Sequence, residues 1–371
     1  MRKQVLKHRH IAIGIVAAFP ALASSMKYLC ALWFMFCAVF ASMQASGAEQ
    51  TLRVLAWPGY ADSDLVEVFQ KRYKVKVEIT LVGSDEVLRS KLAENQGGDF
   101  DVIAANTAEI HNYVNQGLLQ PLHPEHIANT ARQLPRFRDY SRIPDIVVDG
   151  EIYAVPYVWS DMGLIYDRKQ FSQPPGSIES MWDPRFQGRV LAFNTGNHNF
   201  SIASLALGGD PFQIKAADFP QVTDKLIALR RNVLTFYSLP EEAAELFRSH
   251  SVALIFANYG RQQLKQLRDA GVDVGYVVPR EGALAWLDCW AVSKRARDPA
   301  LANLWINYML EPEVSKALTE RQDLSNTLQE PKDASPSSRL IWLRPVEDDQ
   351  RRAALWQRIV SGERPPLREQ R

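Results

Sequence analysis

The sequence of 371 residues contains only three cysteines, and two of them, Cys30 and Cys37, lie in an apolar run near the amino terminus. If that segment is removed, Cys289 remains alone, so the rest of the chain cannot form an intramolecular disulfide. Its stability must come from hydrophobic cores, which a chain of this length can supply.

The sequence also lacks the motifs that usually accompany catalysis. It has no Gly-x-Ser-x-Gly, no P-loop and no dinucleotide-binding fingerprint. Cys289 follows Asp288 in an apolar strand, where burial raises the pKa of a thiol and leaves it unreactive. We therefore expect a protein that is not an enzyme and takes no cofactor. A hydrolase or transferase remains a remote alternative, because missing motifs do not exclude one.

The sequence also shows no histidines spaced as the ligands of a metal site usually are. The histidines beyond residue 48 are not paired with one another or with carboxylates at the separations that metal sites use. They are His111, His123, His126, His198 and His250. His123 and His126 are three residues apart, but they flank prolines in a loop, so a surface pair is favoured over a metal site.

The amino-terminal segment carries charge of one sign. Residues 1–48 hold five basic side chains and no acidic one, and they include the apolar run Tyr28–Phe40, which is short for a membrane span. The small residues Ser46, Gly47 and Ala48 follow it, in the pattern that a signal peptidase recognises. We predict a removable secretory signal, cleaved near Ala48, and a periplasmic protein.

Translation could start at Met1 or at Met26. Met26 lies immediately before the apolar run and would begin an ordinary signal peptide, so residues 1–25 could be an upstream extension. A cysteine that becomes lipid-modified follows small residues at the end of the apolar run. Cys37 does not follow small residues, and Cys30 lies too near the beginning of the run. A lipid anchor is not expected.

Without residues 1–48 the chain has 38 basic and 42 acidic residues, a formal net charge of −4. A mildly acidic chain argues against a nucleic-acid partner and is compatible with cationic ligands. About 320 residues exceed what one hydrophobic core usually organises, so we expect two domains. We also expect a soluble protein, because no second long apolar stretch occurs, and we expect it to be a monomer.

Strands and helices alternate through the first third of the chain. Apolar spacing predicts strands at 52–57, 74–82 and 99–105, and helices at 64–72, from Ser84 to about 96, and at 107–117. Ser84 is placed to cap its helix. This alternation predicts a mainly parallel sheet with right-handed crossovers.

A second α/β unit follows a loop-rich stretch at 121–144. Strand character resumes at 150–159 and continues through 163–167, where we place the first crossing between domains. Helix and strand patterns then occupy 198–207, 218–231, 241–250, 251–257, 262–270 and 272–278. A strand at 284–292 precedes helices at 299–309, 312–321 and 350–360.

Several phrases of the sequence resemble the spermidine/putrescine-binding proteins, which are solute receptors of bacterial ABC importers. The phrase from Leu55 to Tyr60 (Leu-Ala-Trp-Pro-Gly-Tyr) resembles the start of that family, and the loop Val82–Glu86 continues the likeness. Further matching phrases are Phe100–Ile103, Ile152–Trp159 with Gly163, Glu281–Asp288, and Asn303–Pro312. Together, in this order, the matching phrases extend over nearly the whole chain after residue 48.

The resemblance implies the two-lobed type II periplasmic binding protein fold, an α/β fold of mainly parallel sheets with flanking helices. Its ligand cleft lies at the hinge and closes around the ligand. We expect one lobe from residues 49–157 plus about 290–333. The other lobe is expected from about 158–289 plus 334–371.

The resemblance also suggests where the ligand binds. An extended amine needs carboxylates for its ammonium groups and aromatic faces for its methylene chain. Trp57 and Tyr60 match an aromatic pair, Ser84 and its neighbour Asp85 match a polar helix start, and Trp286 with Asp288 matches an aromatic-x-acid pair. Structural alternatives are core packing for the aromatic pair, a capping role alone for Ser84, and an ion pair for Asp288.

The departures from the family pattern concern the identity of the ligand. Asn194 and Asn197 stand where polyamine receptors usually have acids, Phe256 replaces a common tryptophan, and Tyr259 replaces a polar or acidic residue. Gly59 has no side chain where some putrescine receptors carry an acid. A single firm carboxylate suits one ammonium better than several.

The ligand therefore stays open between a monoamine, an amino acid such as an ω-amino acid, and a polyamine held with the help of Asp85, Glu86 or Asp161. The resemblance implies capture of a polyamine or related small amine for a membrane permease of an ABC importer. A sensor of the same fold, which signals to a membrane receptor, is the alternative, because docking surfaces carry no recognisable motif.

Overall fold

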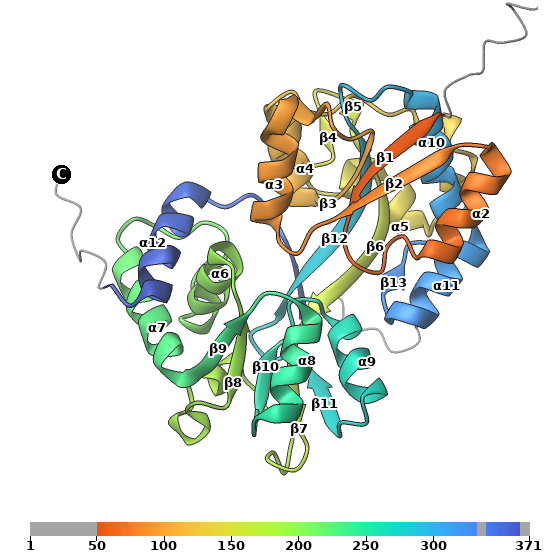
Figure 1. The fold of residues 1–371 in the computed structure, drawn as a ribbon. Helices are drawn as coiled ribbons and strands as arrows, with labels where there is room; N and C mark the ends of the chain where they lie inside the picture. Colours follow the sequence, from red (N-terminus) through yellow and green to blue (C-terminus); the bar gives the residue numbers. More distant parts are fainter. Residues whose placement is uncertain (1–49, 332–338, 364–371) are drawn as a thin grey trace, which may run out of the picture. The chain divides into compact units, whose positions relative to one another are not determined.

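The computed structural model describes residues 50–331 and 339–363. The predicted signal segment and its cleavage point near Ala48 lie outside the described residues. Residues from Thr51 onward form one compact unit, which is built around two larger β-sheets (Figure 1).

The first sheet has seven strands in the order β13-β6-β12-β3-β1-β2, with β14 beside β12. The strands are β1 (Thr51–Ala56), β2 (Lys76–Leu81), β3 (Val102–Asn106), β6 (Ala154–Met162), β12 (Ala283–Val292), β13 (Ser325–Asn326) and β14 (Leu340–Trp342). Side chains alternate across it, since Val54 and Leu55 of β1 enter the cores on opposite faces.

Helices cover both faces of this sheet. They are α2 (Ser63–Tyr73), α3 (Asp85–Ala93), α4 (Thr107–Asn115), α5 (Pro135–Arg138), α10 (Pro299–Met309) and α11 (Pro312–Gln322). Ser84 caps α3, because its hydroxyl oxygen accepts a hydrogen bond of 3.3 Å from the backbone N–H of Val87. On one face, Trp305 of α10 meets Trp290 of β12 edge to face, with ring centroids 6.1 Å apart.

The second sheet has five strands in the order β11-β7-β10-β8-β9. Its strands are β7 (Leu164–Asp167), β8 (Val190–Phe193), β9 (Val233–Tyr237), β10 (Leu254–Phe256) and β11 (Val274–Val277), and its helices are α6 (Gly196–Ala206), α7 (Phe219–Asn232), α8 (Pro240–Ser249), α9 (Arg261–Asp269) and α12 (Asp349–Ser361). Helix α12 packs against α6 and α7, so the end of the described chain joins the core of this sheet (Figure 1).

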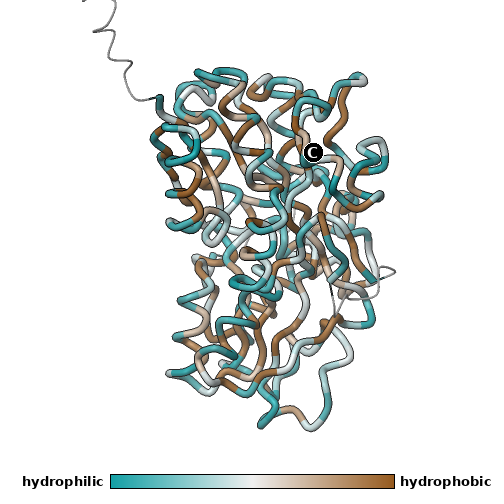
Figure 2. The backbone as a smooth tube through the Cα atoms, turned by 90° about the vertical axis from the view of Figure 1, so that its right-hand side faces the viewer, coloured by the Kyte–Doolittle hydropathy of each residue, from teal (hydrophilic) through white to brown (hydrophobic). Residues whose placement is uncertain are grey.

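Short elements complete the chain. A two-stranded sheet pairs β4 (Val147–Val148) with β5 (Glu151–Ile152), and single 3₁₀ turns are η1 (Glu94–Gly97), η2 (Pro124–His126), η3 (Ala128–Arg132), η4 (Tyr140–Arg142), η5 (Ile178–Trp182) and η6 (Pro184–Phe186). Hydrophobic residues recur along the strands and helices of both sheets, whereas many outer loops are hydrophilic (Figure 2).

Both larger sheets mix the two strand directions. The predicted parallel pairing holds for β1 with β2 and β3, and for β8 with β9 and β10. Other pairs are antiparallel. Strand β12 is antiparallel to both β3 and β6, and strand β7 is antiparallel to both β10 and β11. The expectation of mainly parallel sheets is therefore correct only for the βαβ portions.

Strands β6 and β12 form the long antiparallel pair beside the site described below. Their register shifts by one residue between Asp288 and Cys289, because Tyr157 is an extra residue in β6. Pro156 lies next to this bulge, where the absence of an N–H is tolerated. Cys289 faces the core and is fully buried, and burial raises the pKa of its thiol, as the sequence predicted.

The predicted elements from residue 52 to 117 are present, with ends that differ by a few residues, and so are the helices predicted in the second half. The elements β4, β8, β9, β13, β14 and α5 were not predicted from the sequence. The division into lobes stays a prediction, since the chain from Thr51 onward forms one compact unit.

Candidate functional site

A cavity lies where loops and helix starts of the two larger sheets meet, and its empty volume is about 530 Å³ including solvent at its mouth. Seven residues predicted for ligand binding line it: Trp57, Tyr60, Ser84, Asp85, Tyr259, Trp286 and Asp288. The lining is completed by Asn106, Met162, Phe193, Thr195, His198, Asn258, Gln262 and Leu343.

Asp288 of β12 is the carboxylate at the aromatic end of the cavity. It is 5% exposed, and its Oδ2 accepts a hydrogen bond of 2.6 Å from the hydroxyl of Tyr60. Burial raises its pKa to about 7, the hydrogen bond from Tyr60 acts in the opposite direction, and the charge of Asp85 raises the pKa further. Among the described residues no cation forms an ion pair with Asp288, so this carboxyl has room for a positive partner.

Two tryptophans flank this carboxyl, and each is fixed through its indole nitrogen. Nε1 of Trp57 donates to the carbonyl oxygen of Ala104 at 3.1 Å, and Nε1 of Trp286 donates to that of Asn258 at 3.3 Å. Both rings remain partly exposed. Because the N–H edges are already bonded, the ring faces are left to contact a cation or a hydrocarbon chain.

In the turn after β1, Gly59 lies between Trp57 and Tyr60 and offers no side chain to the cavity. Gly59 has φ +83°, and a Cβ there would lie 2.6 Å from Cδ of Gln322 and 2.9 Å from Nε2 of Gln262. The same Nε2 donates to the carbonyl oxygen of Pro58 at 3.3 Å. An acid at this position would therefore be excluded both by the backbone conformation and by these two glutamines.

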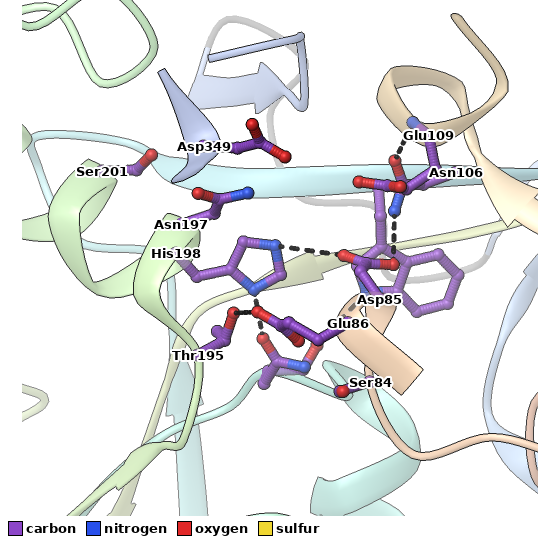
Figure 3. Close-up of polar contacts among 12 residues, drawn as sticks. Ser84, Asp85, Glu86, Asn106, Glu109, Thr195, Asn197, His198, Ser201 and Asp349 are labelled. Atoms are coloured by element: carbon purple, nitrogen blue, oxygen red, sulfur yellow. Dashed lines mark hydrogen bonds and ion pairs between the residues drawn. The ribbon is translucent and has the colours of Figure 1, made fainter. Parts of the chain in front are cut away.

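Asp85 begins helix α3 and lines the same cavity, where its carboxylate points toward Asn106 and His198 (Figure 3). Its Oδ1 accepts a hydrogen bond of 3.0 Å from the side chain of Asn106, and its Oδ2 lies 3.9 Å from Nε2 of His198. Nδ1 of His198 is 2.7 Å from Oδ1 of Asn258. Burial raises the pKa of Asp85, and so does the charge of Glu86, while His198 and Arg89 lower it.

Several hydrogen bonds join residues of the two sheets around the cavity. The hydroxyl of Thr195 donates to Glu86 at 2.8 Å (Figure 3). The hydroxyl of Tyr259 lies 2.9 Å from the carbonyl oxygen of Gly83 and 3.0 Å from that of Ser238, and it can donate to either. These bonds hold the two sides of the cavity together.

Other predicted residues lie elsewhere. Asn194 is exposed and accepts a hydrogen bond of 3.0 Å from Nε1 of Trp356, and Phe256 is 1% exposed in the core of the second sheet. Asp161 is buried and bonded by the hydroxyl of Tyr276. Asn197 lines a neighbouring polar cavity. The structure thus brings seven of the ten predicted residues together in this cavity.

Three lining residues, Asn106, Thr195 and His198, were not predicted from the sequence as part of the site. Asn106 ends β3 and caps α4, and Thr195 precedes α6 directly after β8. Since side chains at the carboxyl ends of parallel strands meet at one edge of a sheet, the first two carried a usable positional signal. His198 carried none, because one histidine in a helix is usually structural.

Residues 50–331 and 339–363 contain no group of three or more histidine, cysteine or carboxylate side chains arranged to hold a metal ion. Over the same residues, every helix is too short or too polar to cross a lipid bilayer.

A family model and individual relatives of known name point to the same protein family. Residues 64–335 match the family model described as bacterial extracellular solute-binding protein. The chain is 26% identical over 280 residues to spermidine/putrescine-binding periplasmic protein 1 of Haemophilus influenzae, which covers 74% of each chain. It is also 26% identical over 301 residues to a putrescine-binding periplasmic protein of Escherichia coli, which covers 77% of this chain and 80% of the relative.

Solved structures show the same architecture. A spermidine/putrescine ABC transporter substrate-binding protein from Streptococcus pneumoniae superimposes with a TM-score of 0.67 at 20% identity, over 85% of this chain and 98% of that one. The fold is therefore the two-lobed α/β fold of periplasmic binding proteins. The chain belongs to the bacterial extracellular solute-binding protein family.

Proposed function

We propose that this protein binds a small cationic amine, a polyamine or a related compound, in the cavity between Trp57, Tyr60, Trp286 and Asp288. The observation that carries this proposal is Asp288, a buried carboxyl with one hydrogen bond from Tyr60 and no cation paired to it in the described residues. A buried charge without a partner is costly, and an ammonium would supply the missing charge.

The aromatic rings support the same ligand class. Trp57 and Trp286 can face both an ammonium and the methylene groups attached to it, and a cation over such a ring contributes about 0.5–2 kcal/mol, depending on desolvation. A simple anion would meet Asp288 as a like charge. A neutral solute would leave that carboxyl unpaired.

We further propose that the protein acts in the periplasm after cleavage of a signal peptide near Ala48. It would deliver its ligand as a monomer to the membrane permease of an ABC importer, without catalysing a reaction. The names of the relatives in Haemophilus influenzae and Escherichia coli support periplasmic binding. If deletion of the gene in the source bacterium lowers uptake of the ligand, delivery is supported. Unchanged uptake with a lost response would favour the sensor.

Thermal unfolding of the chain from residue 49 tests the ligand class. Spermidine, putrescine and n-butylamine should be compared with n-butanol and butyrate as uncharged and anionic controls. A ligand at a hundredfold excess over its Kd stabilises the native state by about 2.7 kcal/mol, so a binding amine should raise the midpoint and the controls should not. A panel in which no amine raises the midpoint would overturn the proposal.

A further inference from the structure

A second cavity adjoins the first, with an empty volume of about 490 Å³. The two cavities share four lining residues, which are Asp85, Asn106, His198 and Leu343. Figure 3 shows that the carboxylate of Asp85 points toward the ring of His198. Asp85 begins α3, which covers the first sheet, whereas His198 lies in α6, which belongs to the second. The wall that both cavities share therefore contains an acid and a base from different sheets.

The carboxylate of Asp85 already has a protein partner at each oxygen. The side-chain amide of Asn106 donates a hydrogen bond of 3.0 Å to Oδ1, and Nε2 of His198 lies 3.9 Å from Oδ2. The other ring nitrogen of His198, Nδ1, lies 2.7 Å from Oδ1 of Asn258. An imidazolium donates from both of its nitrogens, so an oxygen atom beside each nitrogen suits the charged ring. His198 can thus serve as the cation for Asp85.

The other acids near this pair share a cation of their own, Arg89 of α3. Its Nη1 lies 3.3 Å from Glu109 and 2.9 Å from Asp349, and its Nη2 lies 3.9 Å from Glu86. Burial first, and then the charge of Asp85, raise the pKa of Glu109 to about 8, so this carboxyl is largely neutral at pH 7. The acids of this region are therefore met by positive charges that the protein itself supplies.

Asp288 differs from these acids. It is 5% exposed, the hydroxyl of Tyr60 donates a hydrogen bond to it, and no cation pairs with it among the described residues. One ammonium of a ligand would therefore gain a charged partner at Asp288. A second ammonium beside Asp85 would instead meet the imidazolium of His198, and two positive charges a few ångströms apart repel each other strongly where water is largely excluded.

We propose that His198 determines the specificity of the site. Its imidazolium takes the place of a second ligand cation beside Asp85, so the ligand is an amine with a single positive charge. The proposal rests on the function proposed above, because that one ammonium occupies the Asp288 end. Leu343, which is almost fully buried in the wall that both cavities share, favours an uncharged group there. The chemical class is a primary amine whose hydrocarbon stem lies against the aromatic rings and whose far part carries no second cation.

This selection should depend on pH, because a neutral imidazole does not repel a cation. The titratable and charged groups around His198 come from several elements: Asp85, Glu86 and Arg89 of α3, Glu109 of α4, Asp288 of β12, Tyr259 after β10, Arg344 after β14, and Asp349 and Arg352 of α12. The charge of Asp288 acts on the first ammonium of either ligand, so its titration cancels in the ratio of diamine to monoamine affinity. The other groups are the same in the parent and in a variant of His198. Comparing that ratio between the two proteins therefore isolates the imidazolium.

The test is calorimetry at about pH 5.5 and about pH 8, which bracket the ordinary titration of histidine. Putrescine is compared with n-butylamine, and cadaverine with n-pentylamine. At the lower pH the parent should bind each monoamine at least as tightly as the matched diamine. His198→Gln should shift the ratio toward the diamine by roughly tenfold at that pH and remove most of its pH dependence. His111→Gln, which removes a histidine 3.7 Å from Asp145 outside both cavities, is the matched control and should behave as the parent does.

The parent alone provides a test that does not depend on any variant folding. If it binds a diamine more tightly than the matched monoamine at about pH 5.5, the imidazolium does not exclude a second ammonium. That result would overturn the specificity proposal and leave the proposed function intact. The same conclusion follows if His198→Gln and the parent show one ratio at both pH values. If no amine binds the parent, the proposed function fails as well.

Discussion

The two ends of the binding region place a buried carboxyl in different surroundings. Asp288 lies among aromatic rings, with one hydroxyl donor and no cation paired to it in the described residues. Glu109 lies in a polar lining, close to Arg89 and to other carboxylates. Burial is the largest cause of the raised pKa at both, but neighbouring acids contribute more to the environment of Glu109.

The two carboxyls therefore offer a ligand different interactions. The Asp288 end can accept any group that carries an ammonium and a short hydrocarbon chain, because its walls are flat rings and one carboxyl. The Glu109 end differs, because its carboxyl already lies beside Arg89, a guanidinium that also faces Glu86 and Asp349. Each of the following changes alters one end and leaves the other as it is.

The largest effect is expected at the aromatic end. Asp288→Asn keeps the shape but removes the charge that faces a desolvated ammonium. Truncating a buried hydrogen-bonded charge pair costs roughly 2–5 kcal/mol, which is about 30-fold or more in Kd. Monoamines and diamines should weaken alike in calorimetry. Asp149→Asn, at an exposed turn, is the matched control, and equal Kd values for the parent and Asp288→Asn would exclude Asp288 from the site.

The second effect concerns pH and the stability of the ligand-free protein. The folded pKa values of Asp288 and Glu109 are raised to about 7 and about 8, above their ordinary values. The stability that their neutral forms contribute is complete below the ordinary pKa and is lost as pH rises through the folded pKa. Carboxyls with lowered pKa values, such as Asp101, change only at lower pH.

The thermal midpoint should therefore fall by roughly 2 °C or more between about pH 5 and about pH 9. Glu109→Gln and Asp288→Asn should each reduce that fall, and the double variant should reduce it further. Thermal unfolding followed by circular dichroism measures the effect. If both single variants keep the full slope of the parent, neither carboxyl has a raised pKa in the folded protein.

The smallest effect compares the two asparagines that the sequence placed near the ligand. Asn197 lines the polar cavity, whereas Asn194 is exposed and bonded to Trp356. Asn197→Asp adds a carboxylate to that cavity and should improve the binding of spermidine over n-butylamine by a few fold, about 1 kcal/mol. Asn194→Asp should not change that ratio. A larger change for Asn194→Asp than for Asn197→Asp in competition calorimetry would contradict this arrangement.

Some of this arrangement could be predicted from the sequence because it depends on local patterns. A proline and a glycine directly after a strand predict the turn at Trp57–Tyr60. An acid within the apolar strand at 284–292 indicates a buried carboxyl that needs a partner. Ser84 has the ordinary signal of a helix cap, and the structure shows it in that role.

Other features could not be predicted because they depend on segments far apart in the chain. From the sequence, Glu109 would be expected on the surface, in the first turn of α4. It is buried in a region that includes Arg89 and the start of α12. Asn194 follows a strand, as predicted, but its side chain turns to Trp356 of α12, more than 160 residues later. Strand β8 has only four residues, too few to show a period.

Leu343 follows β14 late in the chain, whereas Trp57 follows β1, so the binding region joins segments almost three hundred residues apart. A chain that ends before Leu340 would contain Trp57, Tyr60 and Asp288 but would lack β14, Leu343 and Asp349. During synthesis, the lining of this cavity would therefore stay incomplete until nearly all of the chain is present. A fragment cut before that point would lack Leu343, which is part of the cavity lining, and helix α12, which packs against α6 and α7.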